Sequence, residues 1–253
     1  MCSSDLEFLQ NNKIKISKIN NIYKKNFYNI YNNFNKNFLP KVYAKIATSK
    51  NYYSFIKNRP QITNIYSRKL THILRSEINA ILIGVNTHNI DNPILNCRIP
   101  GLDKINPARF IIDPNLRIKR NSKLILSAKK IKTYIFYSIK NNNKINYLKN
   151  KNIYPIYLPL DKNKHVNCKE ILVTMGLLGY KNVLIEGGYN TIKRFMDLKL
   201  IDTFYFFNNN ETANKKTSHS FKNIYMILKK LFKKNKKLQQ IYLKNNSLTV
   251  FQK

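Results

Sequence analysis

Short apolar runs separated by polar, Asn- and Lys-rich stretches recur along this chain from Lys41 onward. Runs of this length, bounded by polar residues, are typical of strands that are covered on both faces of a sheet. Strands are therefore predicted at residues 42–47, 79–84, 109–113, 123–127, 133–137, 154–158, 182–186 and 202–207. The last two runs, 238–243 and 247–252, are separated by Asn245-Asn246 and predict a closing hairpin.

Helical spacing of apolar residues marks several of the segments between these strands. Thr63-Asn64 can cap one helix, and Asn167, with Glu170 in its first turn, can cap a second that ends at Gly179. A third helix is predicted after Gly187-Gly188. The residues expected on the inner faces are Tyr66, Leu70, Ile73 and Leu74 in the first helix, Ile171, Leu172, Met175 and Leu178 in the second, and Ile192, Phe195 and Met196 in the third.

Other stretches lack this regular pattern. Within residues 1–40, only a short strand at 11–17 and a poor helix at 22–34 are indicated. Residues 141–151 are expected to form a solvated loop, and residues 208–237 form a basic, low-complexity segment. Poor patterning gives these stretches little apolar surface to bury, so we place them outside the predicted core.

The alternation of strands and helices indicates the fold class. Such a pattern is typical of an α/β fold whose sheet is mostly parallel at its centre. We interpret residues 41–253 as one domain of this class and residues 1–40 as an N-terminal extension. Residues 208–237 are a variable segment within the domain.

Charge changes this picture only in part. The 253 residues include 46 Lys and Arg against 12 Asp and Glu, a formal net charge of +34. Such an excess attracts phosphates, in nucleic acid, in anionic lipid or in phosphorylated metabolites. Drift toward AT-rich codons is the competing explanation, because Lys, Asn, Ile, Tyr and Phe are abundant together, Trp is absent and there are six Gly. The sequence has no zinc-finger spacing, leucine-zipper heptads or RNA-binding aromatic signature, so no specific nucleic-acid partner is expected.

Cysteine usage and hydropathy indicate the compartment. Cys2, Cys97 and Cys168 are far apart and belong to no CxxC motif or Cys/His cluster, so we expect neither a disulfide framework nor a metal site. No apolar run is long enough to span a bilayer, and the N-terminus lacks the basic-then-apolar order of a signal peptide. These features predict a cytoplasmic protein without a membrane partner.

The junction Glu186-Gly187-Gly188 is the strongest local signal for a functional site. A buried strand ends there in a carboxylate, at the edge where open α/β sheets bind ligands. Glycine lets the backbone approach a ligand closely, and the following helix N-terminus offers N–H groups to a phosphate. The alternative is a plain tight turn with Glu186 in solvent.

Two further groups of polar residues leave alternatives open. Thr87, Asp91 and Arg98 follow the strand that ends at Gly84, and suit a ribose, an amide and a phosphate. The alternative is an Asp-Asn-Pro turn with an exposed arginine. Lys45 lies within an apolar strand, where burying an ammonium is costly. A substrate phosphate or carbonyl that pairs with it is one explanation, and an edge strand that faces water is the other.

In their order along the chain, these motifs resemble one family. It is the reductase half of the bacterial bifunctional riboflavin-biosynthesis deaminase/reductase, and the resemblance runs from about Phe34 to Asp202. The motifs that carry it are K-x-A-x-S from Lys45, I-T at Ile62-Thr63, L-R-x-x-x-x-A-I-L-I-G from Leu74, T-x-x-x-D-N-P-x-L-x-x-R from Thr87, R-x-x-I-D from Arg109, and I-E-G-G from Ile185.

The resemblance implies a fold and a reaction. The fold would be dihydrofolate-reductase-like, with a mixed, mostly parallel central sheet flanked by helices. The reaction would be the NADPH-dependent reduction of 5-amino-6-(5-phosphoribosylamino)uracil to 5-amino-6-(5-phosphoribitylamino)uracil in riboflavin biosynthesis, with hydride delivered to C1′ of the sugar. The family also implies a homodimer.

Roles carried over residue by residue are likewise expectations. They give two catalytic residues, a substrate-binding set and a cofactor-binding set. Lys45 and Glu186 are the catalytic residues; Arg75, Leu95, Arg98 and Glu186 contact the phosphorylated pyrimidine substrate; Ala47, Thr87, Asp91, Gly188, Tyr189, Asn190 and Thr191 contact NADPH.

The sequence departs from the family pattern on one side of this expected site. Where the family reads S-L-D-G, this chain has Ser49-Lys50-Asn51-Tyr52, and Arg59-Pro60-Gln61 replaces a Ser-x-Trp. Pro114 stands where the family often has serine, and residues 208–237 lack the usual tail pattern. A diverged, weakly active or inactive reductase domain that supports a separate deaminase is therefore the alternative.

The deaminase half itself has no counterpart here. Its His-Ala-Glu and Pro-Cys-x-x-Cys motifs, which hold zinc and move protons, are missing from the sequence. The segment before Lys41 resembles only the linker from that half. The chain is therefore expected either to be a fragment of a bifunctional protein or to work with a separate deaminase.

Overall fold

The computed structural model describes residues 11–12, 38–54, 62–213, 220–232 and 238–253. The chain divides into two compact units, and Phe38–Lys253 is the unit that contains the sheet and helices below. Apart from Asn11 and Asn12, the strand and helix predicted within residues 1–40 lie outside the described residues. The interpretation of that stretch as a linker from a deaminase stays a prediction.

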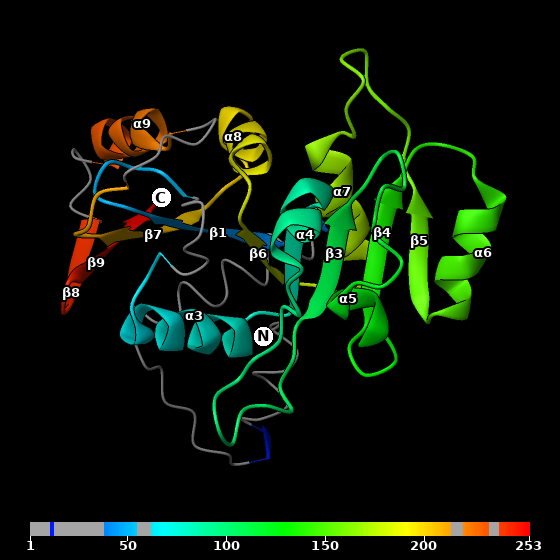
Figure 1. The fold of residues 1–253 in the computed structure, drawn as a ribbon, viewed down its shortest axis with the longest axis horizontal. Helices are drawn as coiled ribbons and strands as arrows, with labels where there is room; N and C mark the ends of the chain where they lie inside the picture. Colours follow the sequence, from blue (N-terminus) through cyan, green and yellow to red (C-terminus); the bar gives the residue numbers. More distant parts are fainter. Residues whose placement is uncertain (1–10, 13–37, 55–61, 214–219, 233–237) are drawn as a thin grey trace. The chain divides into compact units, whose positions relative to one another are not determined.

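Among the described residues, the strands form a single nine-stranded sheet in the order β5-β4-β3-β2-β6-β1-β7-β9-β8 (Figure 1). All pairs from β5 to β7 are parallel, and the C-terminal hairpin adds β9 and β8 antiparallel to β7. The bounds are β1 Lys41–Thr48, β2 Ala80–Gly84, β3 Ala108–Ile112, β4 Thr133–Tyr137, β5 Ile153–Tyr157, β6 Asn182–Glu186, β7 Thr203–Asn209, β8 Leu238–Leu243 and β9 Asn246–Gln252.

Helices cover both faces of this sheet. One buried core lies between the sheet and α7, α8 and α9, and a second lies between the opposite face and α4, α5 and α6. Figure 1 shows α3 on the side of the sheet away from α8 and α9. The bounds are α3 Ile65–Glu77, α4 Val85–Asp91, α5 Lys123–Leu126, α6 Asn142–Asn150, α7 Cys168–Leu177, α8 Tyr189–Asp197 and α9 Lys222–Phe232.

The sheet confirms the predicted α/β fold with a mostly parallel centre. The most apolar runs form its middle, since β2 and β6 are fully buried except at one end each. Strand β1 lies between β6 and β7 and alternates, so that Val42, Ala44 and Ile46 enter one core. Lys45 therefore belongs to a central strand, which excludes the alternative of an edge strand facing water.

Two predictions of local structure were wrong. Residues 123–127, predicted as a strand, form helix α5, and residues 141–151, predicted as a loop, contain helix α6. In both cases a polar side chain caps the first turn: Ser122 accepts from Ile125 N, and Asn141 accepts from Lys144 N. These caps outweigh the β-rich composition of the first segment and the polarity of the second.

The predicted buried stripe of α3 was wrong in part: Leu74 is buried and Leu70 is half-buried, as expected, but the other two residues are not. Tyr66 and Ile73 are exposed, whereas Ser67, Thr71 and Leu74 are buried. The hydroxyl of Thr71 donates to the Ser67 carbonyl at 2.9 Å, so it can be buried with its hydrogen bond satisfied. With these short polar side chains α3 can pack against the sheet. Another side of the helix lines the pocket at the carboxyl edge of the sheet.

The C-terminal region needed smaller corrections. Helix α9 lies within the segment 208–237 that was predicted to be irregular, and its Ile224 and Leu228 enter the core. The hairpin turn is Lys244-Asn245 rather than Asn245-Asn246, because Leu243 pairs with Asn246. Of the helices in the described residues, none combines the length and apolar character needed to cross a membrane.

Candidate active site

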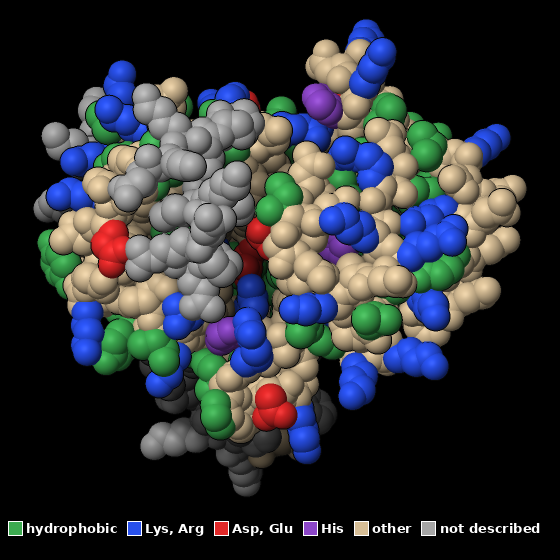
Figure 2. Space-filling view, in the orientation of Figure 1, with side chains coloured by type: hydrophobic (Ala, Val, Ile, Leu, Met, Phe, Trp, Pro, Cys, Tyr) green, Lys and Arg blue, Asp and Glu red, His purple; other side chains and the backbone are tan. Residues whose placement is uncertain are grey.

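A pocket of about 930 Å³ lies along the carboxyl ends of the neighbouring strands β1, β6, β2 and β3. This edge of a parallel sheet is where α/β proteins bind ligands, and the volume is large enough for a sizeable one. Basic side chains are scattered over the face shown in Figure 2, and a hollow near its middle holds acidic and basic side chains close together. The scatter agrees with charge that is spread rather than gathered on one element.

The structure brings the predicted site residues together. Every residue expected to contact substrate or cofactor lines this one pocket, although they come from four separate parts of the chain. They are Lys45 and Ala47 from β1, Arg75 from α3, Thr87, Asp91, Leu95 and Arg98 from α4 and the loop after it, and Glu186, Gly188, Tyr189, Asn190 and Thr191 from β6 and α8. Their individual roles stay predictions.

An ion pair between Arg75 and Glu186 lies at the centre of the pocket. Arg75 donates from Nε to Oε1 at 2.7 Å and from Nη2 to Oε2 at 2.8 Å, and from Nη1 to the Asn96 carbonyl at 3.1 Å. Burial alone would raise the pKa of Glu186, but the charge and hydrogen bonds of Arg75 lower it to about 2. Glu186 is therefore a buried, ionised carboxylate, and the alternative of a solvated turn residue is wrong.

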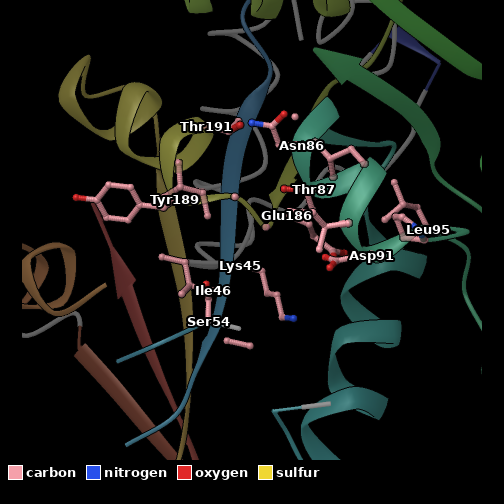
Figure 3. Close-up of a pocket in the computed structure, with 18 of the residues that line it drawn as sticks. Lys45, Ile46, Ser54, Asn86, Thr87, Asp91, Leu95, Glu186, Tyr189 and Thr191 are labelled. Atoms are coloured by element: carbon pink, nitrogen blue, oxygen red, sulfur yellow. The ribbon is translucent and has the colours of Figure 1, made fainter. Parts of the chain in front are cut away.

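Lys45 lies beside this pair. Its Cα is the register partner of that of Glu186 on the adjacent strand, so both side chains emerge on the same face of the sheet. Figure 3 shows Lys45 close to Glu186 and Asp91 in the pocket. Burial lowers the pKa of Lys45, while the charges of Glu186 and Asp91 oppose that shift. An ammonium with a lowered pKa, held near carboxylates, is suited to give up a proton to a bound ligand.

The two glycines after Glu186 are required by packing. Gly187 has φ +83° and Gly188 φ +24°, where side chains are disfavoured. A Cβ at Gly187 would lie 2.7 Å from Thr87 Cγ2, and one at Gly188 would lie 2.8 Å from Thr87 Oγ1. The N-terminal ends of α4 and α8 therefore meet here. Gly188 offers α8 no side-chain cap, which leaves the helix N-terminus available to an anion.

The loop from Asp91 to Arg98 is held by a hydrogen bond from a buried arginine. Arg109 is fully buried and donates from Nη1 to the Ile94 carbonyl at 3.0 Å. Leu95, next in the chain, has φ +59° and is buried at the pocket wall. Arg98 is exposed at the rim, as the alternative of a simple turn expected, yet it also lines the pocket.

The sequence reasoning missed other basic residues in the pocket. Arg68 and His72 lie on α3 at the helical spacing that leads to Arg75, and all three line the pocket. Arg117, after β3, lines the opposite end, and its guanidinium donates to Asn86 Oδ1 at 3.0 Å. The i, i+4, i+7 spacing of these three residues on α3 was the available signal, but the prediction for this helix rested on its apolar residues.

The segment in which the sequence departs from the family pattern is ordered where it is described. Asn51 Oδ1 accepts from Ser49 Oγ at 2.7 Å and from Ala213 N at 3.0 Å. Tyr52 stands at φ +68°, at the position of the family's glycine, at a cost of about 1 kcal/mol. Its ring packs on that of Tyr225 at 5.1 Å between centroids, which offsets that cost. Residues 59–61 lie outside the described residues.

The described part of the chain contains no group of three or more His, Cys, Asp or Glu side chains that could hold a metal ion. Within that part, the acidic residues that line the pocket are Asp91 and Glu186, and basic residues outnumber them. The pocket is therefore suited to ligands that carry several negative charges.

Comparison with known proteins gives one consistent result. Residues 44–209 match the family model described as the RibD C-terminal domain. The chain is 34% identical over 146 residues to the riboflavin biosynthesis protein RibD of Aquifex aeolicus, a match that covers 58% of this chain and 39% of that protein. It is 29% identical over 181 residues to the 5-amino-6-(5-phosphoribosylamino)uracil reductase of Buchnera aphidicola, covering 67% of this chain and 82% of that protein.

The fold is shared with a solved structure. The structure of Acinetobacter baumannii RibD superposes with a TM-score of 0.74 at 16% identity, over 99% of this chain and 68% of that chain. At this identity the likeness establishes the fold. The chain spans 39% of the Aquifex protein, so it corresponds to a part of that longer relative.

The central ion pair yields a stability prediction. Arg75→Met should lower the free energy of unfolding by about 3–5 kcal/mol, because it leaves a buried carboxylate without its partner. Glu186→Leu should do the same to the guanidinium. The double variant should lose much less than the sum, which urea unfolding at neutral pH would measure.

The pH dependence provides the control. The folded pKa of Glu186 lies below its usual value of 4.5, so its stabilising effect is full above pH 4.5 and is lost as the pH falls toward about 2. This loss should be absent from the double variant. Additive single losses in the urea experiment would contradict the coupling.

Proposed function

Because the chain belongs to the RibD C-terminal domain family, we propose that it catalyses the NADPH-dependent reduction of 5-amino-6-(5-phosphoribosylamino)uracil to its ribitylamino product in riboflavin biosynthesis. The observation that carries the proposal is the buried Arg75–Glu186 pair beside Lys45, next to the glycine junction that opens α8. These are the residues that the family resemblance selected, and they line one pocket.

The pocket has two chemically different ends. It runs past four neighbouring strands spaced about 4.8 Å apart, which leaves room for two ligands side by side. The end between β1 and α3 holds Lys45, Arg75, Glu186 and Arg98 and suits the phosphorylated pyrimidine. The end between α4 and α8 suits the cofactor.

The cofactor end fits a dinucleotide. The uncapped N-terminus of α8, with Gly188 to Thr191, would receive its diphosphate, and the absence of side chains at Gly187 and Gly188 would let it approach. Thr87, Asp91 and Ala47 would contact the nicotinamide and ribose portion. When bound, NADPH supplies the hydride that reduces C1′ of the sugar.

The protein's own residues would position the substrate and manage protons. Glu186, held ionised by Arg75, would accept hydrogen bonds from the substrate and fix its orientation. The Lys45 ammonium would donate a proton to the sugar ring oxygen as C1′ is reduced. Among the described residues, no hydrogen bond or ion pair engages the Arg98 guanidinium, so its N–H groups would bind the substrate phosphate.

A preference for NADPH over NADH has a specific candidate. Arg117 lies at the cofactor end of the pocket and is exposed. The Asp113 carboxylate accepts from Arg117 N and Ile118 N at 2.8 Å and so holds the loop, while Asn86 orients the guanidinium. An arginine with further N–H groups available suits the phosphate that distinguishes NADPH from NADH.

The alternative is a diverged, weakly active or inactive domain that supports a separate deaminase. Two altered stretches, residues 49–52 and 59–61, motivated it. Asn51 and Tyr52 make compensating contacts, and residues 59–61 lie outside the described residues. We therefore favour the active enzyme, located in the cytoplasm. A deaminase acting before it, in the same or another protein, would supply the substrate.

The reaction itself is tested by NADPH oxidation with the deaminated pyrimidine phosphate as substrate. Wild-type protein should turn over. Lys45→Met should lower kcat by about 100-fold or more, because the proton donor is lost. Lys132→Met is the control, since Lys132 is an exposed lysine just before β4 that lines neither this pocket nor the second groove, and it should retain full activity. Folded wild-type protein that neither binds NADPH nor turns over would establish the alternative.

Cofactor selection is tested at Arg117. Arg117→Gln should lower the ratio of kcat/KM for NADPH to that for NADH by about tenfold, the usual effect of losing one charged hydrogen bond. Arg120→Gln is the control, because Arg120 is nearby but does not line the pocket. An unchanged ratio in the Arg117 variant would remove this residue from cofactor recognition.

We also propose a homodimer. An apolar groove of about 340 Å³ lies between α3 and the sheet, lined by residues that include Tyr43, Tyr205 and Val250, and a second copy would cover it. Analytical ultracentrifugation should give twice the chain mass, and Val250→Glu should shift it toward the monomer because it places a charge in the interface. A monomeric wild-type protein would contradict the assignment.

A further inference from the structure

The binding of Arg75 to Glu186 raises a question about the substrate phosphate. A phosphate monoester carries close to two negative charges and is usually held by more than one cation. Arg75 was expected to contribute, but its Nε and Nη2 groups bind Glu186 and its Nη1 group binds the Asn96 carbonyl. Most of the N–H donors of Arg75 are therefore engaged within the protein. A substrate phosphate bound by Arg98 would then need its second cation from another residue.

Arg68 is placed to be that partner. It lies two helical turns before Arg75 on α3, and both side chains line the pocket. Its Nη1 group donates to the Thr63 carbonyl at 2.6 Å, which holds the side chain back along the helix start. The ion pairs found among the described residues involve other cations, so the remaining guanidinium N–H groups of Arg68 have no carboxylate there.

His72 lies between Arg68 and Arg75 along α3, and it also lines the pocket. It lies one turn after Arg68, and burial together with the charges of Arg75 and Arg98 lowers its pKa. Its Nδ1 lies 3.2 Å from the Asn96 carbonyl, which can only accept, so Nδ1 is the nitrogen that donates. The lowered pKa favours the neutral ring. Among the described residues that line this part of the pocket, Arg68 and Arg98 therefore carry permanent positive charge together with N–H groups that no hydrogen bond or ion pair there engages.

We propose that Arg68 and Arg98 together form a phosphomonoester subsite at the α3 rim, and that Arg68 makes the site select sugar phosphates over the corresponding free sugars. The proposal rests on the proposed function, since it assigns the phosphate end of that substrate. The subsite also sets the orientation of the substrate in the pocket. The phosphate lies at the rim between α3 and the loop after Leu95, and the sugar carbon to be reduced lies deeper, beside Lys45 and Glu186.

The test uses the full chain and ribose 5-phosphate as the probe, with ribose as its uncharged counterpart. Calorimetric binding is measured for wild type, Arg68→Gln, Arg68→Lys and Lys69→Gln. Lys69 is the matched control, because it is the neighbouring cation on α3 but is exposed and outside the pocket. Thermal unfolding of each variant checks that the fold is intact.

Arg68→Gln should weaken ribose 5-phosphate binding by about tenfold or more, and Arg68→Lys should weaken it less because it keeps the charge but loses the planar fork. Lys69→Gln should bind as wild type does, and NADPH binding should be the same in all four proteins. The KM for the pyrimidine phosphate should rise in parallel, with kcat little changed.

The possible failures are distinguishable. If wild type turns over and binds ribose 5-phosphate while Arg68→Gln matches Lys69→Gln, the subsite is wrong and the proposed function stands. Equal loss of ribose and ribose 5-phosphate binding in Arg68→Gln would likewise overturn the subsite, since it would show general damage to the pocket. If wild type binds neither NADPH nor the sugar phosphate and does not turn over, the proposed function fails and the subsite fails with it.

Discussion

The buried pair of Arg75 and Glu186 is the interaction on which the rest of the site depends. It joins α3 to the end of β6, and it turns a carboxylate that burial would protonate into an ionised group. A buried ion pair is costly unless its hydrogen bonds are complete, and the carbonyl of Asn96 extends the hydrogen bonding on the arginine side. The same arginine thereby fixes the loop that carries Leu95 and Arg98.

The glycine junction that follows Glu186 depends on close packing in the same way. Thr87 of α4 occupies the space in which side chains at positions 187 and 188 would lie, so two helix ends converge next to the central ion pair. The Arg75–Glu186 ion pair and a backbone that a ligand can approach closely therefore lie side by side at the carboxyl edge of the sheet. The proposed function uses this arrangement for two ligands: the diphosphate of the cofactor at the N-terminus of α8, and the phosphorylated sugar beside β1 and α3.

Much of this could be predicted from the sequence. Most of the buried strands, the helix that begins after Asn167 and a set of residues that proves to line one pocket were recognisable, because apolar runs, caps and glycines act over a few residues. Helices α5 and α6 were missed because single capping residues, Ser122 and Asn141, decided them against the composition of their segments. The stripe of α3 was misjudged because its polar residues, rather than its apolar ones, meet the sheet and the pocket.

The sequence by itself selected the residues that stand in local motifs, from Lys45 to Thr191, and these line one pocket, whereas Arg68, His72 and Arg117 stand in no such motif and were missed. It did not determine what those residues do to one another. How α3 lies across β1 and β6 decides that Arg75 binds Glu186, 111 positions away. It also decides that Arg68 finds no carboxylate partner among the described residues. Local signals fix elements, but the partner of a buried charge is fixed by the packing of distant elements, where desolvation makes an unpaired charge costly.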